Sequence, residues 1–220
     1  MISHSRENPS SSPAEKAFCA NLLQAIHAAA QPLTILRAGL GNSEADQISL
    51  EALRELTTHS AAEVERLCLF FSYIQQFVIT ESFPPHLAVA ELPPLLEHVV
   101  DGVGLLFETS GMHLTIELPD ACPSVLIDSA RTPQALSSVL LLAHSLSRSQ
   151  DTVQLLVSWS ASEVKLIVEN QNACVKSFNA EENLSIALAE SNIRSQKGTF
   201  SYTTNPFRVQ IQLATASFQS

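Results

Sequence analysis

The sequence has few basic residues, few cysteines and no apolar stretch long enough to cross a bilayer. Its 220 residues include 12 Lys and Arg against 22 Asp and Glu, which gives a net charge of -10. This balance argues against a general nucleic-acid binder, because such proteins gain affinity by neutralising phosphates with their own cations. Uninterrupted apolar runs, such as residues 67–71 and 139–143, are far shorter than the roughly 20 residues that span a membrane. We therefore expect a soluble, cytoplasmic chain with no nucleic-acid or membrane partner.

The four cysteines form no recognisable site. Cys19, Cys68, Cys122 and Cys174 lie far apart and include no CxxC pair. We expect each to be a small buried side chain in a reducing compartment, not half of a disulfide. The seven histidines show no HExxH or other metal-ligand spacing. The sequence therefore predicts neither a structural disulfide nor a metal site.

Enough apolar residues are present for a folded core. Hydrophobic residues make up 45% of the chain and charged residues 15%, a composition that excludes disorder. Residues 1–13, rich in Ser, Pro and Asn, are typical of a flexible tail. The segment Ser82-Phe83-Pro84-Pro85 marks a boundary, because proline breaks a helix. We predict a first domain over residues 14–82 and a second over residues 83–220.

The first predicted domain has the spacing of a hairpin of two helices. In both, apolar residues recur at alternating steps of 3 and 4, the pattern of helices that pack at the shallow angle of a four-helix bundle. The first seam consists of Cys19, Leu22, Ile26, Ala29, Leu33, Leu36 and Leu40, and the second of Val64, Leu67, Phe71, Ile74 and Val78. A single hairpin cannot enclose both seams, whereas two hairpins together form a closed bundle. The geometry therefore predicts a homodimer.

The second predicted domain mixes the periods of helices and strands. This interleaving, with antiparallel hairpins, favours a two-layer α+β domain. We expect helices at about 92–109, 132–148 and 181–195, and strands at about 113–118, 124–128, 152–158, 163–169, 199–203 and 208–213. The last four strands are expected to form two hairpins.

His27 lies one position past the first seam, about 100° around the helix. It shares a polar stripe at helical spacing with Gln24, Gln31 and Thr34. We therefore expect its ring on the outside of the bundle. Taken alone, the pattern also fits an ordinary surface histidine followed by an incidental kink at Pro32.

The segment His27-Ala28-Ala29-Ala30-Gln31-Pro32-Leu33 resembles the phospho-acceptor box of two-component histidine kinases, which reads His-Glu/Asp-x-x-Asn/Thr/Gln-Pro-Leu. In that family the box lies on a dimerising helical hairpin that precedes a Bergerat-type ATP-binding domain. The same order of elements is expected here over about residues 14–214. The resemblance implies that His27 is the phospho-acceptor and that Gln31 bonds the phosphoryl group or orients water. A plain solvated glutamine is the alternative for Gln31.

The sequence departs from that family at several positions that handle nucleotide. Ala28 stands where the family has an acidic residue that acts as a base. Leu142 and Leu146 stand where the family has asparagines that hold magnesium and nucleotide. The family's Asp-x-Gly-x-Gly motif corresponds to Glu-Asn-Gln-Asn-Ala at residues 169–173, and a later Gly-rich turn to Asn183-Leu184-Ser185. Without these glycines the backbone cannot easily approach phosphates, so we expect a degenerate domain that does not bind ATP.

Four other features are expected to be structural. Asp128-Ser129-Ala130-Arg131 resembles an Asp-x-x-Arg turn of the same family, and we interpret it as helix capping. His98 and His144 are expected to be partly buried on helices, and Trp159 to pack at the end of a strand.

Together these features predict a histidine phosphotransferase that passes phosphoryl groups to and from the receiver-domain aspartates of response regulators, without ATP-dependent autophosphorylation. No cofactor of its own is expected, because the receiver partner would supply the magnesium ion. The predicted partner surface surrounds His27 and includes Leu23, Gln24, Ala30 and Thr34. The alternative is a non-catalytic, kinase-like scaffold that binds and regulates receivers or kinases, and the sequence does not separate the two.

Overall fold

The computed structural model describes residues 26, 30, 33–35, 37, 50–119 and 121–216. By their contacts the residues divide into two units, Met1–Ile74 and Gln75–Ser220, and each is described by itself. Helix α2 (Leu50–Ser82) begins in the first unit and ends in the second. It ends directly before Phe83-Pro84-Pro85, where proline removes the backbone donor that a further turn would need. The predicted domain boundaries stay a prediction.

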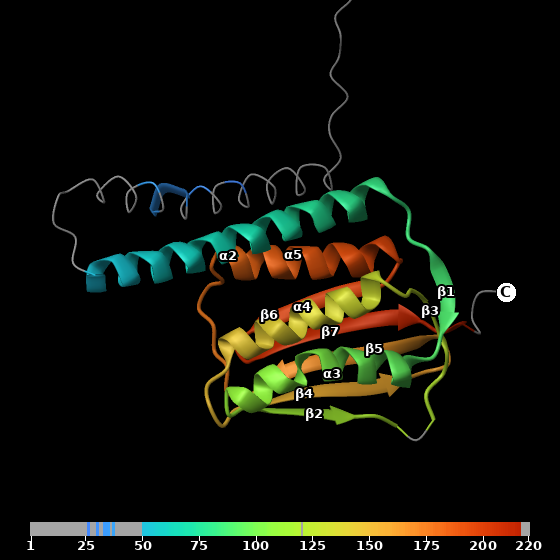
Figure 1. Ribbon diagram of the computed structural model, residues 1–220. Helices are drawn as coiled ribbons and strands as arrows, with labels where there is room; N and C mark the ends of the chain where they lie inside the picture. Colours follow the sequence, from blue (N-terminus) through green and yellow to red (C-terminus); the bar gives the residue numbers. More distant parts are fainter. Residues whose placement is uncertain are drawn as a thin grey trace, which may run out of the picture. The chain divides into compact units, whose positions relative to one another are not determined.

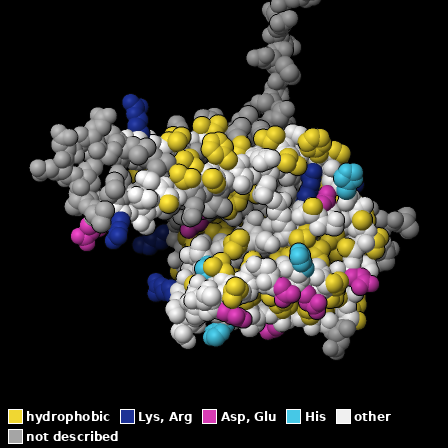
Figure 2. All heavy atoms as spheres, in the orientation of Figure 1, with side chains coloured by type: hydrophobic (Ala, Val, Ile, Leu, Met, Phe, Trp, Pro, Cys, Tyr) yellow, Lys and Arg dark blue, Asp and Glu magenta, His cyan; other side chains and the backbone are white. Residues whose placement is uncertain are grey.

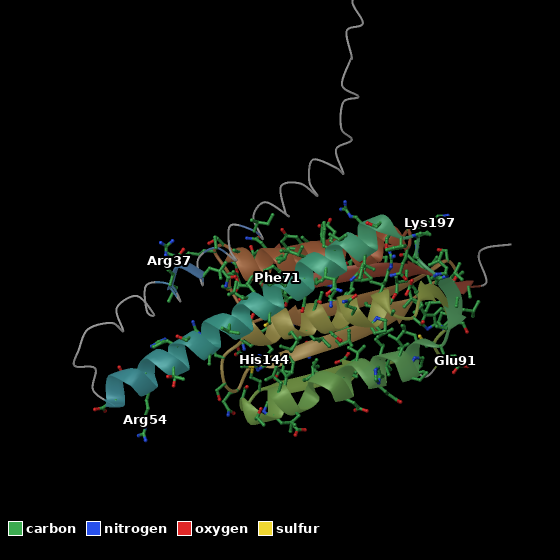
Figure 3. The ribbon with its side chains drawn as sticks, turned by 45° about the horizontal axis from the view of Figure 1, so that its top comes forward. Arg37, Arg54, Phe71, Glu91, His144 and Lys197 are labelled. Atoms are coloured by element: carbon green, nitrogen blue, oxygen red, sulfur yellow. The ribbon has the colours of Figure 1, made fainter. Side chains whose placement is uncertain are left out.

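In the first unit, several apolar side chains of both expected seams are exposed, although Leu67 on α2 is only 8% exposed. The described residues 26, 30, 33–35 and 37 are helical. Ile26 is 54% exposed and Leu33 53%, while on α2 Val64 is 48% exposed and Phe71 60%. Figure 3 shows Phe71 part-way along α2, and Figure 2 shows hydrophobic side chains gathered along this helix. Large apolar side chains that are exposed at regular helical spacing are typical of a surface that packs against another protein segment.

The second unit is built from a sheet with helices on one face (Figure 1). Its remaining elements are β1 (Leu87–Ala90), α3 (Leu92–Thr109), β2 (His113–Glu117), β3 (Val125–Asp128), α4 (Arg131–Leu146), β4 (Thr152–Trp159), β5 (Glu163–Asn170), α5 (Ala180–Ser195), β6 (Thr199–Thr204) and β7 (Phe207–Ala214). The main sheet has the strand order β2-β4-β5-β7-β6, and β1 pairs with β3 in a separate ribbon. The α+β class expected for this part of the chain is confirmed.

The core follows from the period of two along the central strands. Leu155 on β4 pairs with Val168 on β5, which in turn pairs with Val209 on β7. All three are at most 1% exposed and belong to one cluster with apolar residues of α3 and α4. The alternating residues of the same strands point to the opposite face of the sheet.

Two features of the sheet were not expected. Strand β1 has only exposed or half-exposed residues, so no alternation in the sequence marks it. Strands β2 and β4 pair in parallel, with Leu114 beside Val153 and Ile116 beside Leu155. A parallel pair needs a long crossover, here β3 and α4, and therefore leaves no hairpin signal in the sequence. The other expected helices and strands are present beyond residue 92, with ends within two residues of those expected.

Helix α5 begins at a capping box. The Asn179 side chain accepts a hydrogen bond from the Glu182 backbone N–H at 2.9 Å, and Glu182 Oε2 accepts one from the Asn179 backbone N–H at 2.7 Å. Two donors at the helix start are thus satisfied by side chains, which fixes where the helix begins.

Several expected burials were wrong. Cys68 and Cys174 are exposed and Cys122 is half-buried, while Cys19 lies outside the described residues. Cys174 follows the end of β5, where its thiol bonds to Asn205 Oδ1 at 2.9 Å. His98 is exposed because it lies beside the face of α3 that packs on the core. Half-burial of His144 is confirmed.

Trp159 was also expected to pack, yet it is 47% exposed. It is the last residue of β4 and pairs with Val164 next to the turn that leads into β5. Its place at the end of the sheet leaves much of the ring in water.

A substitution at Gly198 tests the contact between the end of α5 and β7. A Cβ atom there would lie 2.8 Å from Ile193 Cγ2 and 2.9 Å from the Gln212 backbone oxygen. We expect Gly198→Ala to lower the free energy of unfolding by about 1–3 kcal/mol, because the neighbours must move. Urea denaturation measures the change.

Gly102→Ala is the matched control, because a Cβ at Gly102 meets nothing within 4 Å. This change should raise the free energy of unfolding by up to about 1 kcal/mol, since alanine favours a helix over glycine. Equal effects at the two positions would contradict the packing described for Gly198.

Candidate functional site

The predicted phospho-acceptor segment is described only in part. His27, Gln31, Leu23 and Gln24 lie outside the described residues, so their predicted roles stay predictions. Ala30 and Thr34 are both helical and exposed. Thr34 Oγ1 donates a hydrogen bond to the Ala30 backbone oxygen at 2.8 Å, a bond that threonine commonly makes one turn back along a helix.

On α4, two leucines stand at the positions where the resemblance to histidine kinases would place magnesium and nucleotide ligands. Leu142 is 4% exposed and belongs to the core cluster, against which Leu146 also packs. Neither side chain carries an atom that could coordinate a cation or accept a hydrogen bond. This part of α4 therefore packs in the hydrophobic core.

At the end of β5, the Glu169 side chain bonds to its neighbours on the sheet. Its carboxylate lies 3.4 Å from Arg208 on the neighbouring strand β7, and Gln171 Nε2 donates to it at 3.2 Å. Successive residues of a strand point to opposite faces. The next residue, Asn170, therefore points to the face on which the helices pack, and it is fully buried.

The Asn170 side chain is satisfied by the chain itself. Its Nδ2 donates to Ser147 Oγ at 2.6 Å and to Asp151 Oδ2 at 3.3 Å, and its Oδ1 accepts from the Asn172 backbone N–H at 2.9 Å. Asn172 Nδ2 in turn donates to Asp151 Oδ1 at 3.2 Å. The side chains of Asn170 and Asn172 thus bond to the loop after α4.

Asp151 is the acceptor at the centre of this cluster. The hydrogen bond from the Arg148 backbone N–H lowers the pKa of Asp151 below its ordinary value. Burial acts to raise the pKa, while the bonds from Asn170 and Asn172 and the charge of Arg148 lower it further. A charged carboxylate is therefore the form that holds the two amides in place.

The connection from β5 to α5 is also packed against the domain. Ala173 is 4% exposed, and its backbone oxygen accepts from the Phe207 N–H at 2.9 Å. In the segment that was compared with a Gly-rich turn, Leu184 and Ser185 are buried, and Ser185 Oγ donates to the Ser138 backbone oxygen on α4 at 3.4 Å. Helix α5 packs directly on α4 at this point.

A second group of polar residues surrounds the turn between β3 and α4. Asp128 Oδ1 accepts from the backbone N–H groups of Ala130 at 2.9 Å and Arg131 at 3.1 Å, and Oδ2 accepts from that of His86 at 2.8 Å. The expected helix capping is found only in part: of these donors Arg131 alone belongs to α4, and the N-cap residue Ala130 makes no side-chain cap hydrogen bond.

Arg131 connects the same turn to the end of α2. Its Nη1 donates to the Thr80 backbone oxygen at 3.2 Å and to Ser195 Oγ at 2.9 Å, and its Nη2 donates to the Phe83 backbone oxygen at 2.7 Å. Its Nε lies 3.7 Å from Asp128 Oδ2, and both side chains are about nine-tenths buried. The guanidinium thus satisfies carbonyl groups that the helix end leaves free.

Four further polar side chains complete this group. Thr80 Oγ1 donates to Asn192 Oδ1 at 2.8 Å. Gln196 Oε1 accepts from the Asp128 backbone N–H at 2.6 Å and from Thr132 Oγ1 at 3.0 Å. All of these residues are at most 8% exposed. We call the set Thr80, Asp128, Arg131, Thr132, Asn192 and Gln196 the junction network.

The junction network sets the charge of Asp128. Burial acts to raise the pKa of this carboxyl group, but the backbone hydrogen bonds and the charge of Arg131 outweigh burial and lower its pKa. Beside the network lies a cavity of about 630 Å³, lined by residues that include Gln76, Phe83 and His86. Sequence reasoning missed the network, because its partners are distant in sequence and no local pattern links them.

The described part of the chain contains neither a cluster of metal-ligand side chains nor a membrane-spanning helix. Within it, no three His, Cys, Asp or Glu side chains lie together as metal ligands would. The helices described in this structure include none with the length and apolar character needed to cross a membrane.

Solved structures of histidine kinases share this architecture. Histidine kinase ThkA in complex with the response regulator protein TrrA matches with a TM-score of 0.72 and 11% identity, over 89% of this chain and 61% of that chain. Histidine kinase AdeS of Acinetobacter baumannii matches with a TM-score of 0.66 and 16% identity, over 86% of this chain and 96% of that chain.

Full-length ShkA in complex with AMPPNP matches with a TM-score of 0.60 and 18% identity, over 88% of this chain and 46% of that chain. This chain has the fold of histidine kinases. It spans less than two thirds of the ThkA and ShkA chains. No family model matches the sequence, and no curated protein matches it.

Within the histidine kinase fold, the junction network can be tested at Arg131. We expect Arg131→Ala to lower the free energy of unfolding by about 3–5 kcal/mol, because it leaves Asp128 buried without its charged partner. Urea denaturation, followed by circular dichroism, measures the loss.

Arg194→Ala provides the control. Arg194 is 64% exposed and pairs with Glu190 one turn earlier on α5 at 2.6 Å. An exposed pair of this kind contributes only about 0–1 kcal/mol. Similar losses in the free energy of unfolding of the two variants would show that Arg131 stabilises the fold no more than an exposed arginine does.

Proposed function

We propose that this chain is a histidine phosphotransferase of a two-component phosphorelay. It passes phosphoryl groups to and from receiver-domain aspartates through His27, and it does not phosphorylate itself from ATP. The phospho-acceptor-like segment at residues 27–33 and the histidine kinase fold support a role in two-component signalling. A kinase with this fold was solved with a response regulator, which supports a receiver as the partner.

One observation carries the distinction from a kinase. Where the sequence comparison assigned nucleotide ligands, Leu142 is buried in the core and Asn170 has its hydrogen bonds within the chain. A nucleotide would have to displace these bonds and would gain no ligand from the leucine. The same positions therefore favour a protein that receives phosphate from another protein.

Phosphotransfer requires only a nucleophilic imidazole and a supporting side chain from this chain. The unprotonated imidazole nitrogen of His27 attacks the phosphorus of a receiver's aspartyl phosphate, a nitrogen–phosphorus bond forms, and the aspartate carboxylate leaves with the electrons of the broken oxygen–phosphorus bond. Such transfers depend mainly on in-line positioning and on charge stabilisation. The receiver brings the magnesium ion, and Gln31, one turn beyond His27, supports the phosphoryl group.

The proposed docking surface is the helical turn around His27. Ala30 and Thr34 are both exposed, and Leu23 and Gln24 are the other proposed contacts. The small side chain of Ala30 leaves room for a partner beside the imidazole. Apolar contact carries this docking, because an acidic chain gains nothing from the acidic pocket of a receiver.

We further propose that two copies form a four-helix bundle. The support is the exposure of Ile26 and Leu33 on one helix and of Val64 and Phe71 on α2. Each would become buried against a second hairpin, and burial of a large apolar side chain contributes about 1.5–3 kcal/mol.

Transfer of labelled phosphate tests the function. Receivers of the host carrying labelled aspartyl phosphate are mixed with this protein, and we expect acid-labile label on the wild type but none on His27→Ala. Labelled ATP with magnesium should leave both proteins unlabelled.

His59→Ala is the control, because His59 is an exposed histidine on α2 outside the predicted box. This variant should accept label as the wild type does. Label that persists in His27→Ala would mean that another residue is the acceptor. No label from any receiver would leave the scaffold function, and label from ATP would make the chain a kinase.

The bundle is tested at Phe71. We expect wild-type protein to scatter light as two copies of a 23.8 kDa chain, and Phe71→Glu to shift the population towards single chains, because it places charge in the apolar seam. Ser72→Glu, at an exposed neighbour outside the seam, should leave the dimer intact. A wild-type mass that stays at one chain at every concentration would rule the dimer out.

A further inference from the structure

A groove runs between α3 and α4 on the second unit. The two helices lie side by side in both ribbon views (Figures 1 and 3), and the cavity between them has a volume of about 320 Å³. Its lining includes the apolar side chains Val99 and Leu141, with His98, Gln134 and Ser137 beside them. None of the positions compared with nucleotide ligands lines it, so the groove is separate from the degenerate nucleotide region.

The lining of the groove includes a glycine whose small size is not required by any described contact. Gly102 lies in the interior of α3 and lines the groove. A Cβ atom at this position would meet nothing within 4 Å. Glycine is less favourable than alanine inside a helix, yet no contact within the described residues requires its small size. The bare backbone leaves room for a side chain from outside to approach the helix closely.

Exposed leucines lie in and near the groove. On α4, Leu141 lines the groove and is 42% exposed. On α3, Leu105 is 71% exposed and Leu106 40%, and both lie about one turn beyond Gly102. Apolar side chains gathered around a hollow are typical of a protein-binding surface.

The charge beside the groove has one sign. Glu97, Asp101 and Glu108 are exposed on α3, and Figure 2 shows acidic side chains over this helix. Their spacing of four and seven residues places them on one exposed face of α3, roughly 100–140° around the helix axis from Gly102. Helix α3 carries no Lys or Arg, and among the described residues no cation lies within ion-pair distance of these three carboxylates.

We propose that this groove binds a helix of a partner protein, which directs an apolar side chain onto Gly102 and Lys or Arg side chains towards Glu97, Asp101 and Glu108. Helix-in-groove recognition has these parts: a hollow, apolar anchors and complementary charge at the edge. The carboxylates repel the anionic surfaces of membranes and nucleic acids, which favours a basic protein segment. The proposal does not depend on His27.

A designed peptide pair tests the charge and the place of binding. The probe is an amphipathic helical peptide with leucines at steps of three and four and lysines on both flanks, and its control carries glutamates in place of the lysines. Nuclear magnetic resonance of the full, isotope-labelled chain should show shifts around residues 98–106 and 134–141 with the lysine peptide only. Added salt should weaken this binding.

Two glycine variants test the groove itself. Gly102→Leu fills the floor and should weaken the lysine peptide at least about tenfold. Gly104→Leu is the matched control, because Gly104 also has nothing within 4 Å of a built Cβ but does not line the groove. Circular dichroism checks that both variants fold. Absence of binding, equal binding of the glutamate peptide, shifts elsewhere, or equal weakening by the two variants would each overturn the proposal.

Discussion

The buried pair of Asp128 and Arg131 is the interaction on which the architecture of the second unit depends. Its two side chains bond to the end of α2, the segment before β1, the start of α4 and the last turn of α5. Burying two charges is costly unless every donor and acceptor finds a partner. Here the backbone groups at the ends of helices supply those partners. The pair therefore joins four chain segments that lie far apart in the sequence.

The positions that were compared with nucleotide ligands are occupied by the core and by the chain's own hydrogen bonds. Leu142 packs inward, while Asn170 bonds to the loop that follows α4. Because bonds within the chain satisfy the Asn170 side chain, these positions contribute to the stability of the fold without a ligand.

Local periods predicted most of this fold, and long-range contacts account for what they missed. The alternation of Val153, Leu155 and Val157 marks β4, because its inner face is buried. Strand β1 has no buried face, so only its pairing with β3 reveals it. At the end of β5 the sequence did not separate the buried Asn170 from its neighbour Glu169, because a shift of one residue moves a strand side chain to the other face. For the phospho-acceptor segment, the predictions at His27 and Gln31 stay predictions.

The hydrogen bonds that Asn170 makes within the chain have a consequence for how the protein would respond to nucleotide levels in the cell. Under the proposed phosphotransferase function, the occupation of these positions by the chain's own amides would make the protein insensitive to the ratio of ATP to ADP. Phosphoryl transfer through it would then be reversible, and its direction would follow the relative amounts of phosphorylated and unphosphorylated partners. Such a protein could serve a pathway in which the direction of transfer reverses.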